Sequence, residues 1–378
     1  MSLPRNGAVA IVASILWAGA AAAQGTLSTQ GLGYPPGQLS TPARTMGGST
    51  GEVDPLSALN PAALALLRNP IIFMQAEPEF RTLQIGAESQ RTSVARFPLF
   101  VGALSLGSRW TAGVSASTLF DRTWATVRRD TQVVGIDTLG SDITQRSDGS
   151  VADLRVAVAF ASTPWLRVGV AGHVYSGRDL MQTARLYDDT ARFQSDTQTT
   201  TLSFGGNAVT LGAHAFWPRV AALGVSYRKG GSLSAYNGGD KIASGTAPDH
   251  IGLSAVYLGV RGASFAVRVA NDTWKNVSDL SPTLNIHSGL DIGVGADVIG
   301  PRFAGNAMNL RAGGRWRTLP FSSDGNAVRE SSWSGGFGLP FAGGRAEVNV
   351  GALRSNRTSD SGISEKAWTL STGFGVRP

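Results

Sequence analysis

Seven basic side chains fall at alternating positions of otherwise apolar segments. They are Arg155, Arg167, His173, Arg228, Arg268, Arg311 and Arg315. A guanidinium can bind a carboxylate through parallel N–H donors, so an inward-facing set of this kind could attract a carboxylate ligand. The same segments also carry acids, at Asp153, Asp291, Asp297 and Glu347. Salt bridges within the protein are therefore the stronger expectation for any one of these arginines.

No catalytic pattern accompanies these side chains. The sequence has no P-loop and no His-Glu-x-x-His motif. Its four histidines, at 173, 214, 250 and 287, do not pair at the spacing of metal ligands, and there is no cysteine. We therefore expect no enzyme, no cofactor and no metal site, and we interpret His173 as a hydrogen-bonded interior residue.

The segments that position these residues alternate with a period of two, as strands with two different faces do. In 151–160, for example, Leu154 and Val156 share one face, while Asp153 and Arg155 share the other. The second faces hold Gly, Ala, Ser, Asn and scattered charges, whereas a soluble sandwich would present more Lys and Glu to water. The pattern predicts an all-β, antiparallel transmembrane β-barrel with a polar lumen.

Composition also favours a membrane barrel. Only 16% of residues are charged, and there are 48 glycines and 9 tryptophans. Glycine lets strands bend and approach closely, and tryptophan is enriched at bilayer interfaces. The net charge is +7, and the arginines are spread along the strands, so we expect no nucleic-acid partner. A basic lumen, or contact with anionic lipid head groups, explains the charge better.

Residues 1–23 have the features of a signal peptide. Arg5 precedes an apolar stretch from Ala8 to Trp17, and Ala21-x-Ala23 before Gln24 forms a cleavage site. The apolar run of about 16 residues is shorter than the roughly 20 that a spanning helix needs. We therefore expect the chain to be exported.

The segment 43–64 differs from the strands that follow it. It reads Ala-Arg-Thr-Met-Gly-Gly at 43–48, then Asp54, then Ser-Ala-Leu-Asn-Pro-Ala-Ala-Leu at 57–64. Asn60 suits an N-cap and Pro61 suits the first helical position, which predicts a short helix from Ala62 to Leu67. Ahead of a barrel, this motif resembles the N-terminal region of the FadL-type outer-membrane proteins, the long-chain fatty acid and hydrocarbon transporters. It also resembles their PorV-type relatives, which serve secretion systems.

The resemblance implies that 24–70 is a small element that plugs the lumen of a barrel formed by 71–378. It assigns the plug or gate to Met46, Gly47, Gly48, Leu59, Asn60, Pro61 and Ala62. The Asn-Pro-Ala segment would anchor the plug, and Met46 and Leu59 would touch ligand. The sequence departs from the family at Leu59, where an aromatic residue is frequent, and at Ala63, where glycine is frequent. These departures affect the subfamily more than the fold.

Short turns alternate with long polar segments, as in outer-membrane barrels. We expect periplasmic turns at 162–164, 217–219 and 340–344. We expect extracellular loops at 121–150, 177–200, 230–249, 271–287, 320–331 and 355–365. The first strands are expected at Ile71–Glu77 and Phe80–Gln90, and a short helix at Asp179–Leu186. The count is about fourteen strands, the number usual in the family that the chain resembles.

Two functions stay open at this point. The first is transport of hydrophobic compounds, such as long-chain fatty acids, through a plugged barrel in the outer membrane of a Gram-negative bacterium. The second is a PorV-like binding or assembly protein that serves secretion or surface attachment. The partners would be outer-membrane lipids, lipopolysaccharide and a hydrophobic small molecule, or secreted proteins in the second case. A continuous apolar pocket beside the plug would favour transport, whereas a lumen packed by side chains would favour a scaffold.

Overall fold

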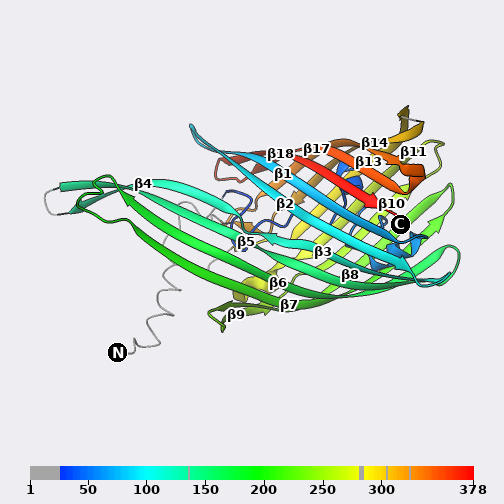
Figure 1. The fold of residues 1–378 in the computed structure, drawn as a ribbon, viewed down its shortest axis with the longest axis horizontal. Helices are drawn as coiled ribbons and strands as arrows, with labels where there is room; N and C mark the ends of the chain where they lie inside the picture. Colours follow the sequence, from blue (N-terminus) through cyan, green and yellow to red (C-terminus); the bar gives the residue numbers. More distant parts are fainter. Residues whose placement is uncertain (1–25, 135–136, 281–284, 304, 323–324) are drawn as a thin grey trace.

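The computed structural model describes residues 26–378 apart from 135–136, 281–284, 304 and 323–324. The expected signal peptide lies outside the described residues. The chain forms a 16-stranded antiparallel sheet, of which fourteen strands close into a barrel (Figure 1). The predicted fold class is thereby confirmed. Among the described residues, no helix is long and apolar enough to cross a membrane.

Each barrel strand pairs with the next barrel strand along the chain, and one further pairing closes the ring. The strands are β1 (Ile71–Ile85), β2 (Glu88–Ser105), β3 (Trp110–Asp121), β5 (Asp137–Ala161), β6 (Leu166–Tyr187), β7 (Asp196–Trp217), β8 (Ala221–Asn237), β10 (Asp249–Tyr257), β11 (Ala263–Thr273), β13 (Gly289–Phe303), β14 (Asn306–Thr318), β16 (Arg329–Phe341), β17 (Ala346–Thr358) and β18 (Ile363–Val376). The closing pair is β18 with β1. Two further strands, β4 (Trp124–Val134) and β9 (Asp240–Thr246), pair with β5 and β8 and extend the wall.

Burial alternates along the strands as the period of two predicts. On β5, Leu154 and Val156 are exposed, whereas Asp153 and Arg155 are buried. The same alternation on the other strands covers the outside with apolar side chains and turns the charged ones inward. An apolar outer band of this kind is what lipid contact requires.

The two ends of the barrel differ. Six short turns, together with the start of β1 and the end of β18, lie at one end. Longer hairpins lie at the other end, where β4 to β7 extend away from the rest of the barrel (Figure 1). Because periplasmic turns are short in outer-membrane barrels, we assign the first end to the periplasm and the second to the outside.

Several expected loops are strands instead. The polar residues of 137–150 pair with β4 on one side and β6 on the other, so hydrogen-bond partners outweigh their polarity. The helix predicted at Asp179–Leu186 is wrong for the same reason, because this segment belongs to β6. The predicted break before Phe80 is also wrong, because β1 continues past Pro78 through an irregularity in its register that needs no donor from proline.

Most of residues 26–70 lie inside the barrel, where Figure 1 shows dark blue segments, and 68–70 are exposed where they lead into β1. They contain one short helix, α2 (Thr41–Thr45), and one 3-10 helix, η1 (Pro61–Leu66). The first packs against β14, β16, β17 and β18, and the second against β3, β5, β6 and β7. This plug therefore contacts two separate sectors of the wall.

Candidate functional site

Asn60 connects the plug to the wall near the periplasmic end. Its Oδ1 accepts the N–H of Ala62 at 3.0 Å, which caps η1, and its Nδ2 donates to the carbonyls of Glu52 and Ala213 at 2.8 and 2.9 Å. Gly169 on β6 makes room for this segment, because a Cβ there would lie 2.6 Å from the nitrogen of Ala62. The predicted short helix is thus present as a 3-10 helix. Asn60 caps it, and its backbone packs against Gly169.

Met46, Gly47 and Gly48 lie against β13 and β14. Both glycines have positive φ angles, +65° and +78°, which other residues rarely adopt. A Cβ at Gly47 would lie 2.7 Å from the backbone nitrogen of Gly314, so the two backbones are in direct contact. The Met46 side chain is buried in an apolar cluster with side chains of β8, β10 and β11. These residues therefore form a structural contact between the plug and the wall.

Glu52 makes a charged contact between the plug and the wall, and it is fully buried. Arg268 donates from Nε to Oε2 at 2.8 Å and from Nη2 to Oε1 at 3.0 Å, and the Ser254 hydroxyl donates to Oε2 at 2.6 Å. Burial alone would raise the pKa of Glu52, but the Arg268 charge, aided by His250, lowers it to about 2. The carboxylate is therefore ionised at neutral pH and is held by a bidentate pair.

A second acid, Asp54, stabilises the plug internally. Its carboxylate accepts from the hydroxyls of Ser40 and Ser57 at 2.5 and 2.6 Å and from the N–H of Leu56 at 3.1 Å. Burial raises the pKa of Asp54 against the effect of these hydrogen bonds. Ser40 also caps α2 by accepting the N–H of Ala43, so one cluster joins the two halves of the plug.

Four arginines surround the ring of Tyr34 towards the extracellular end of the lumen. Their guanidinium carbons lie 4.6 Å (Arg357), 5.0 Å (Arg317), 5.1 Å (Arg96) and 5.9 Å (Arg81) from its centroid. Four acids, Glu79, Asp121, Glu330 and Glu365, form ion pairs with these arginines. The faces of the Tyr34 ring attract cations, so the plug inserts an aromatic group at the centre of a buried charge network.

The sequence analysis did not single out this network. A signal was present, because Glu79 and Arg81 alternate with the exposed Phe80 on β1 and therefore had to face inward. The sequence did not indicate where Tyr34 lies, because its position depends on how the irregular segment before α2 crosses the lumen.

Beside Tyr34 the wall lacks strand pairing. β2 continues beyond Leu99 towards the extracellular side. Among the described residues, however, β2 pairs with β3 only from the pair Leu99–Ser117 towards the periplasmic end. At the end of β3, Asp121 exchanges both backbone hydrogen bonds with Tyr34, each at 2.8 Å. Arg96 of β2 is joined to Asp121 only through side chains. The plug thus occupies the edge of β3 that β2 leaves free.

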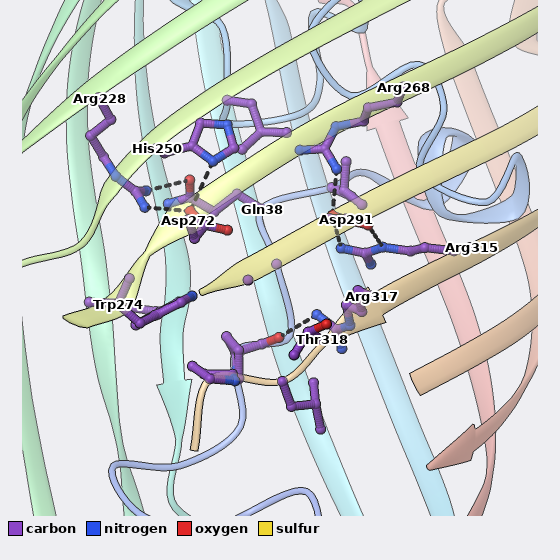
Figure 2. A pocket seen from close by; sticks show the side chains of 18 of the residues that line it. Gln38, Arg228, His250, Arg268, Asp272, Trp274, Asp291, Arg315, Arg317 and Thr318 are labelled. Atoms are coloured by element: carbon purple, nitrogen blue, oxygen red, sulfur yellow. Dashed lines mark hydrogen bonds and ion pairs between the residues drawn. The ribbon is translucent and has the colours of Figure 1, made fainter. Parts of the chain in front are cut away.

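A small cavity lies between the plug and the wall (Figure 2). Its volume is about 70 Å³, room for a few water molecules and far below the roughly 300 Å³ of the smallest typical ligand pockets. Arg268 and Arg315 both bind Asp291 at its border, at 2.5 and 2.7 Å, and Arg228 faces Asp272 at 3.6 Å. Around this cavity the lumen is therefore packed by side chains.

An aromatic cluster adjoins this cavity on its extracellular side. The rings of Phe120, Trp274 and Phe321 lie 5.2 to 5.9 Å apart, and all three are buried. Trp274 begins η2 (Trp274–Leu280), which covers the lumen together with β9. The plug contributes Leu32 to the same cluster. The extracellular part of the lumen thus holds this apolar cluster as well as the charged network around Tyr34.

The structure distributes the predicted lumen residues over several places. Arg228, Arg268 and Arg315 line the cavity together with Leu59 of the plug. His173 bonds through Nδ1 to Asp153 at 2.9 Å and through Nε2 to the Thr210 hydroxyl at 2.8 Å. Arg311 donates to Asp297 at 2.8 Å. Among the described residues, no group of three or more acids and histidines is placed to hold a metal ion.

Arg155 and Arg167 behave differently, because neither forms an ion pair with an acid in the described part of the chain. Arg155 is only 4% exposed, and its Nη1 has no hydrogen-bond partner. The neighbouring Asp153 is engaged by His173 and by Gln38 instead. Arg167 lies 5.9 Å from the ring of Phe216.

Comparisons with solved structures identify the type of barrel. A FadL homologue from Pseudomonas aeruginosa is similar over 91% of this chain and 99% of its own, at a TM-score of 0.62 and 11% identity. The toluene transporter TodX from Pseudomonas putida is similar over the same shares, at 0.59 and 12%. The CymD monoaromatic hydrocarbon channel is similar over 90% of this chain and 97% of its own, at 0.57 and 14%. No protein-family model and no curated protein sequence matches the chain.

The chain has the FadL-type outer-membrane barrel fold. The resemblance seen in the sequence is thereby confirmed at the level of fold. Because sequence identity is 11 to 14%, these similarities establish the fold of the barrel alone.

Proposed function

We propose that this FadL-type barrel carries a hydrophobic small molecule across the outer membrane of a Gram-negative bacterium. The observation that carries the proposal is the position of Tyr34 on the edge of β3. Movement of this one plug segment would release the edge where β2 and β3 are unpaired and would also open the lumen behind it. Opening the wall and the lumen together suits a solute that prefers lipid to water.

In this mechanism the solute first reaches the aromatic cluster of Phe120, Trp274 and Phe321. Lipopolysaccharide is a poor solvent for apolar molecules, so an apolar binding site on the extracellular side supplies the entry step. A shift of the plug then lets the solute leave sideways into the bilayer or inward to the periplasm. The charged middle of the lumen favours such a shift, since water can replace the partners of Glu52 and Arg268 when they separate.

The substrate class is proposed as hydrophobic compounds, with long-chain fatty acids as the largest members. The cavity of about 70 Å³ admits no acyl chain without plug movement. A solute of the size of toluene needs the smaller rearrangement, and two of the similar structures are described as a toluene transporter and a monoaromatic hydrocarbon channel. We therefore infer that small aromatic compounds are carried more readily than fatty acids.

A packed lumen is also what a PorV-like scaffold would contain, so the alternative needs a direct comparison. None of the three similar structures supports a secretion role. The plug is held largely by charged and polar contacts, which suits a part that moves. Export through a signal peptide at 1–23 belongs to the same proposal, and no enzymatic role is proposed.

A disulfide that locks the plug tests the proposal. The hydroxyl oxygens of Thr41 in α2 and Ser371 in β18 lie 3.0 Å apart, and the natural chain has no cysteine. A T41C/S371C variant can therefore form only the intended bridge. The matched control is S234C/S244C, whose hydroxyls lie 3.1 Å apart between β8 and β9, away from the plug. Uptake of labelled toluene and oleate is measured in cells that lack another hydrocarbon channel, before and after reduction.

We expect oxidation to slow uptake at least about tenfold in the locked variant only, and reduction to restore it. Uptake that is unchanged by the lock would refute plug movement. Uptake of both compounds no faster than in cells without the protein would refute transport and would favour the PorV-like scaffold instead.

A further inference from the structure

Arginines gather at the periplasmic end of the barrel. This end consists of the segments 66–70, 105–110, 161–166, 217–221, 257–263, 299–306, 341–346 and 376–378, here called the periplasmic rim. Seven of these eight segments contain one arginine each. They are Arg68, Arg109, Arg219, Arg261, Arg302, Arg345 and Arg377. The rim contains no Asp and no Glu. The positive charge is therefore distributed around the whole circumference.

These arginines are available to a partner, unlike those of the lumen. All but Arg377, which is half-buried, are exposed. Arg377 lies 3.5 Å from Glu347, just inside the barrel, and it also donates to the carbonyl of Gly344. The other six form no ion pair among the described residues. Exposed guanidinium groups without carboxylates nearby are ready to bind anions.

The rim contributes to the net charge of the chain. The sequence predicted that the charge of +7 belongs either to a basic lumen or to a surface in contact with anionic head groups. Most lumen arginines are matched by acids, as Arg268, Arg315 and Arg357 illustrate. At the rim, all the arginines except Arg377 form no ion pair among the described residues. A surface in contact with anionic head groups therefore explains part of the positive charge.

Aromatic side chains place the rim at the level of lipid head groups. Trp110 directly follows Arg109, and Phe303 directly follows Arg302; their side chains are 49% and 62% exposed. Trp217, two residues before Arg219, is also exposed and stacks on Trp165 at 6.2 Å. Exposed aromatic residues occupy the membrane–water interface in barrels. An arginine within one or two residues of such an aromatic side chain then reaches the phosphates.

We propose that the periplasmic rim binds the phosphate groups of anionic phospholipids in the periplasmic leaflet and so gathers these lipids around the barrel. A soluble acidic partner would bind a patch of arginines on one side of the barrel. The rim instead surrounds the wall and lies beside its interfacial aromatic residues, which is the arrangement that surrounding lipids would contact. Guanidinium groups bind phosphate in bidentate fashion, and several weak contacts add around a ring. This lipid preference is independent of the solute that the barrel carries.

The test compares lipid retention by two variants of equal charge. The rim variant is R109Q/R219Q/R261Q/R345Q. The control is R91Q/R128Q/R178Q/R329Q, which removes four exposed arginines from the extracellular half. Each full-length barrel is reconstituted in nanodiscs of phosphatidylcholine with about one-tenth phosphatidylglycerol. The lipids retained by each barrel on release are counted by native mass spectrometry.

We expect the wild-type protein and the control to retain phosphatidylglycerol over phosphatidylcholine by at least about tenfold relative to the supplied mixture, and the rim variant by less than about threefold. Raising the salt concentration from 0.1 to 0.5 M should weaken the preference, because the Debye length shortens. Equal retention of the two lipids by the wild-type protein would overturn the proposal and leave a soluble acidic partner as the explanation. An equal loss in the control variant would overturn it too, since total charge and not the rim would then set the preference.

Discussion

Replacement of Glu52 by glutamine should loosen the plug without disturbing the barrel. The shape of the side chain is kept, but the charge that pairs with Arg268 is lost inside the lumen. The pKa of Glu52 is lowered from 4.5 to about 2, a shift of about 2.5 units. At about 1.4 kcal/mol per unit this corresponds to about 3 kcal/mol, which agrees with the cost of breaking a buried ion pair on one side.

Hydrogen exchange of plug peptides measures this loss directly, because exchange there reports the free energy of local opening. At pH 6.5, peptides covering 38–60 should exchange about 100-fold faster in Glu52→Gln than in the wild-type protein, while peptides from the wall strands stay unchanged. Glu88→Gln is the control, since Glu88 is an exposed acid at the start of β2. Its plug should exchange at the wild-type rate.

The same pair of proteins gives a pH dependence of known sign. The pKa of Glu52 in the folded protein lies below that of the unfolded chain, so its stabilisation is present above about pH 4.5 and is lost as the pH falls towards 2. Taking the difference between wild type and variant isolates Glu52 from Asp54, whose pKa is shifted the other way. A plug that opens equally in both proteins at pH 6.5, or a difference that persists undiminished near pH 2, would refute the reasoning.

Three further changes have defined outcomes. Asn60→Ala removes the cap of η1 and two contacts to carbonyls, so plug opening should become easier by about 1–3 kcal/mol in the same exchange experiment. Gly169→Val pushes a side chain into Ala62 and should displace η1. Gly172→Val on the same strand is the control, because its side chain would meet nothing within 4 Å and should leave the plug in place. Protease should therefore cut the plug more readily in Gly169→Val than in Gly172→Val. Arg155→Met removes a buried cation that has no acid partner and should raise the free energy of unfolding by about 1 kcal/mol, read from the denaturant midpoint. A loss of stability in Arg155→Met would mean that Arg155 has a partner that its geometry does not reveal.

The barrel was predictable because each strand has two environments that demand opposite chemistry. The alternation of Leu154 and Val156 with Asp153 and Arg155 was enough to assign lipid and lumen faces, and the strand count followed from the turns. The extracellular segments were misjudged because their polarity is that of loops. Only the pairing partners, such as β4 for the outer part of β5, make them strands.

The site was predictable only in part, because the plug has no period. Asn60 was found by local chemistry, since a cap needs only its neighbours in sequence. Tyr34 was not found, since its importance comes from arginines and acids on strands spread along the chain from β1 to β18. The pairing of Glu52 with Arg268 was likewise missed, because a lone acid in an irregular segment gives no indication of which of many lumen arginines it will meet.

The plug comes first in the chain, yet some of its partners come last. Ser28 donates to Glu365 of β18 at 2.8 Å, and the Tyr34 hydroxyl accepts from Arg357 of β17 at 3.0 Å. During assembly these plug residues therefore wait without their partners until the final hairpin arrives. That hairpin is also the one that closes the seam of the barrel onto β1. Closure of the seam thus also completes these two plug contacts, so a chain that fails to retain its N-terminal segment leaves Glu365 and Arg357 without them when the ring is sealed.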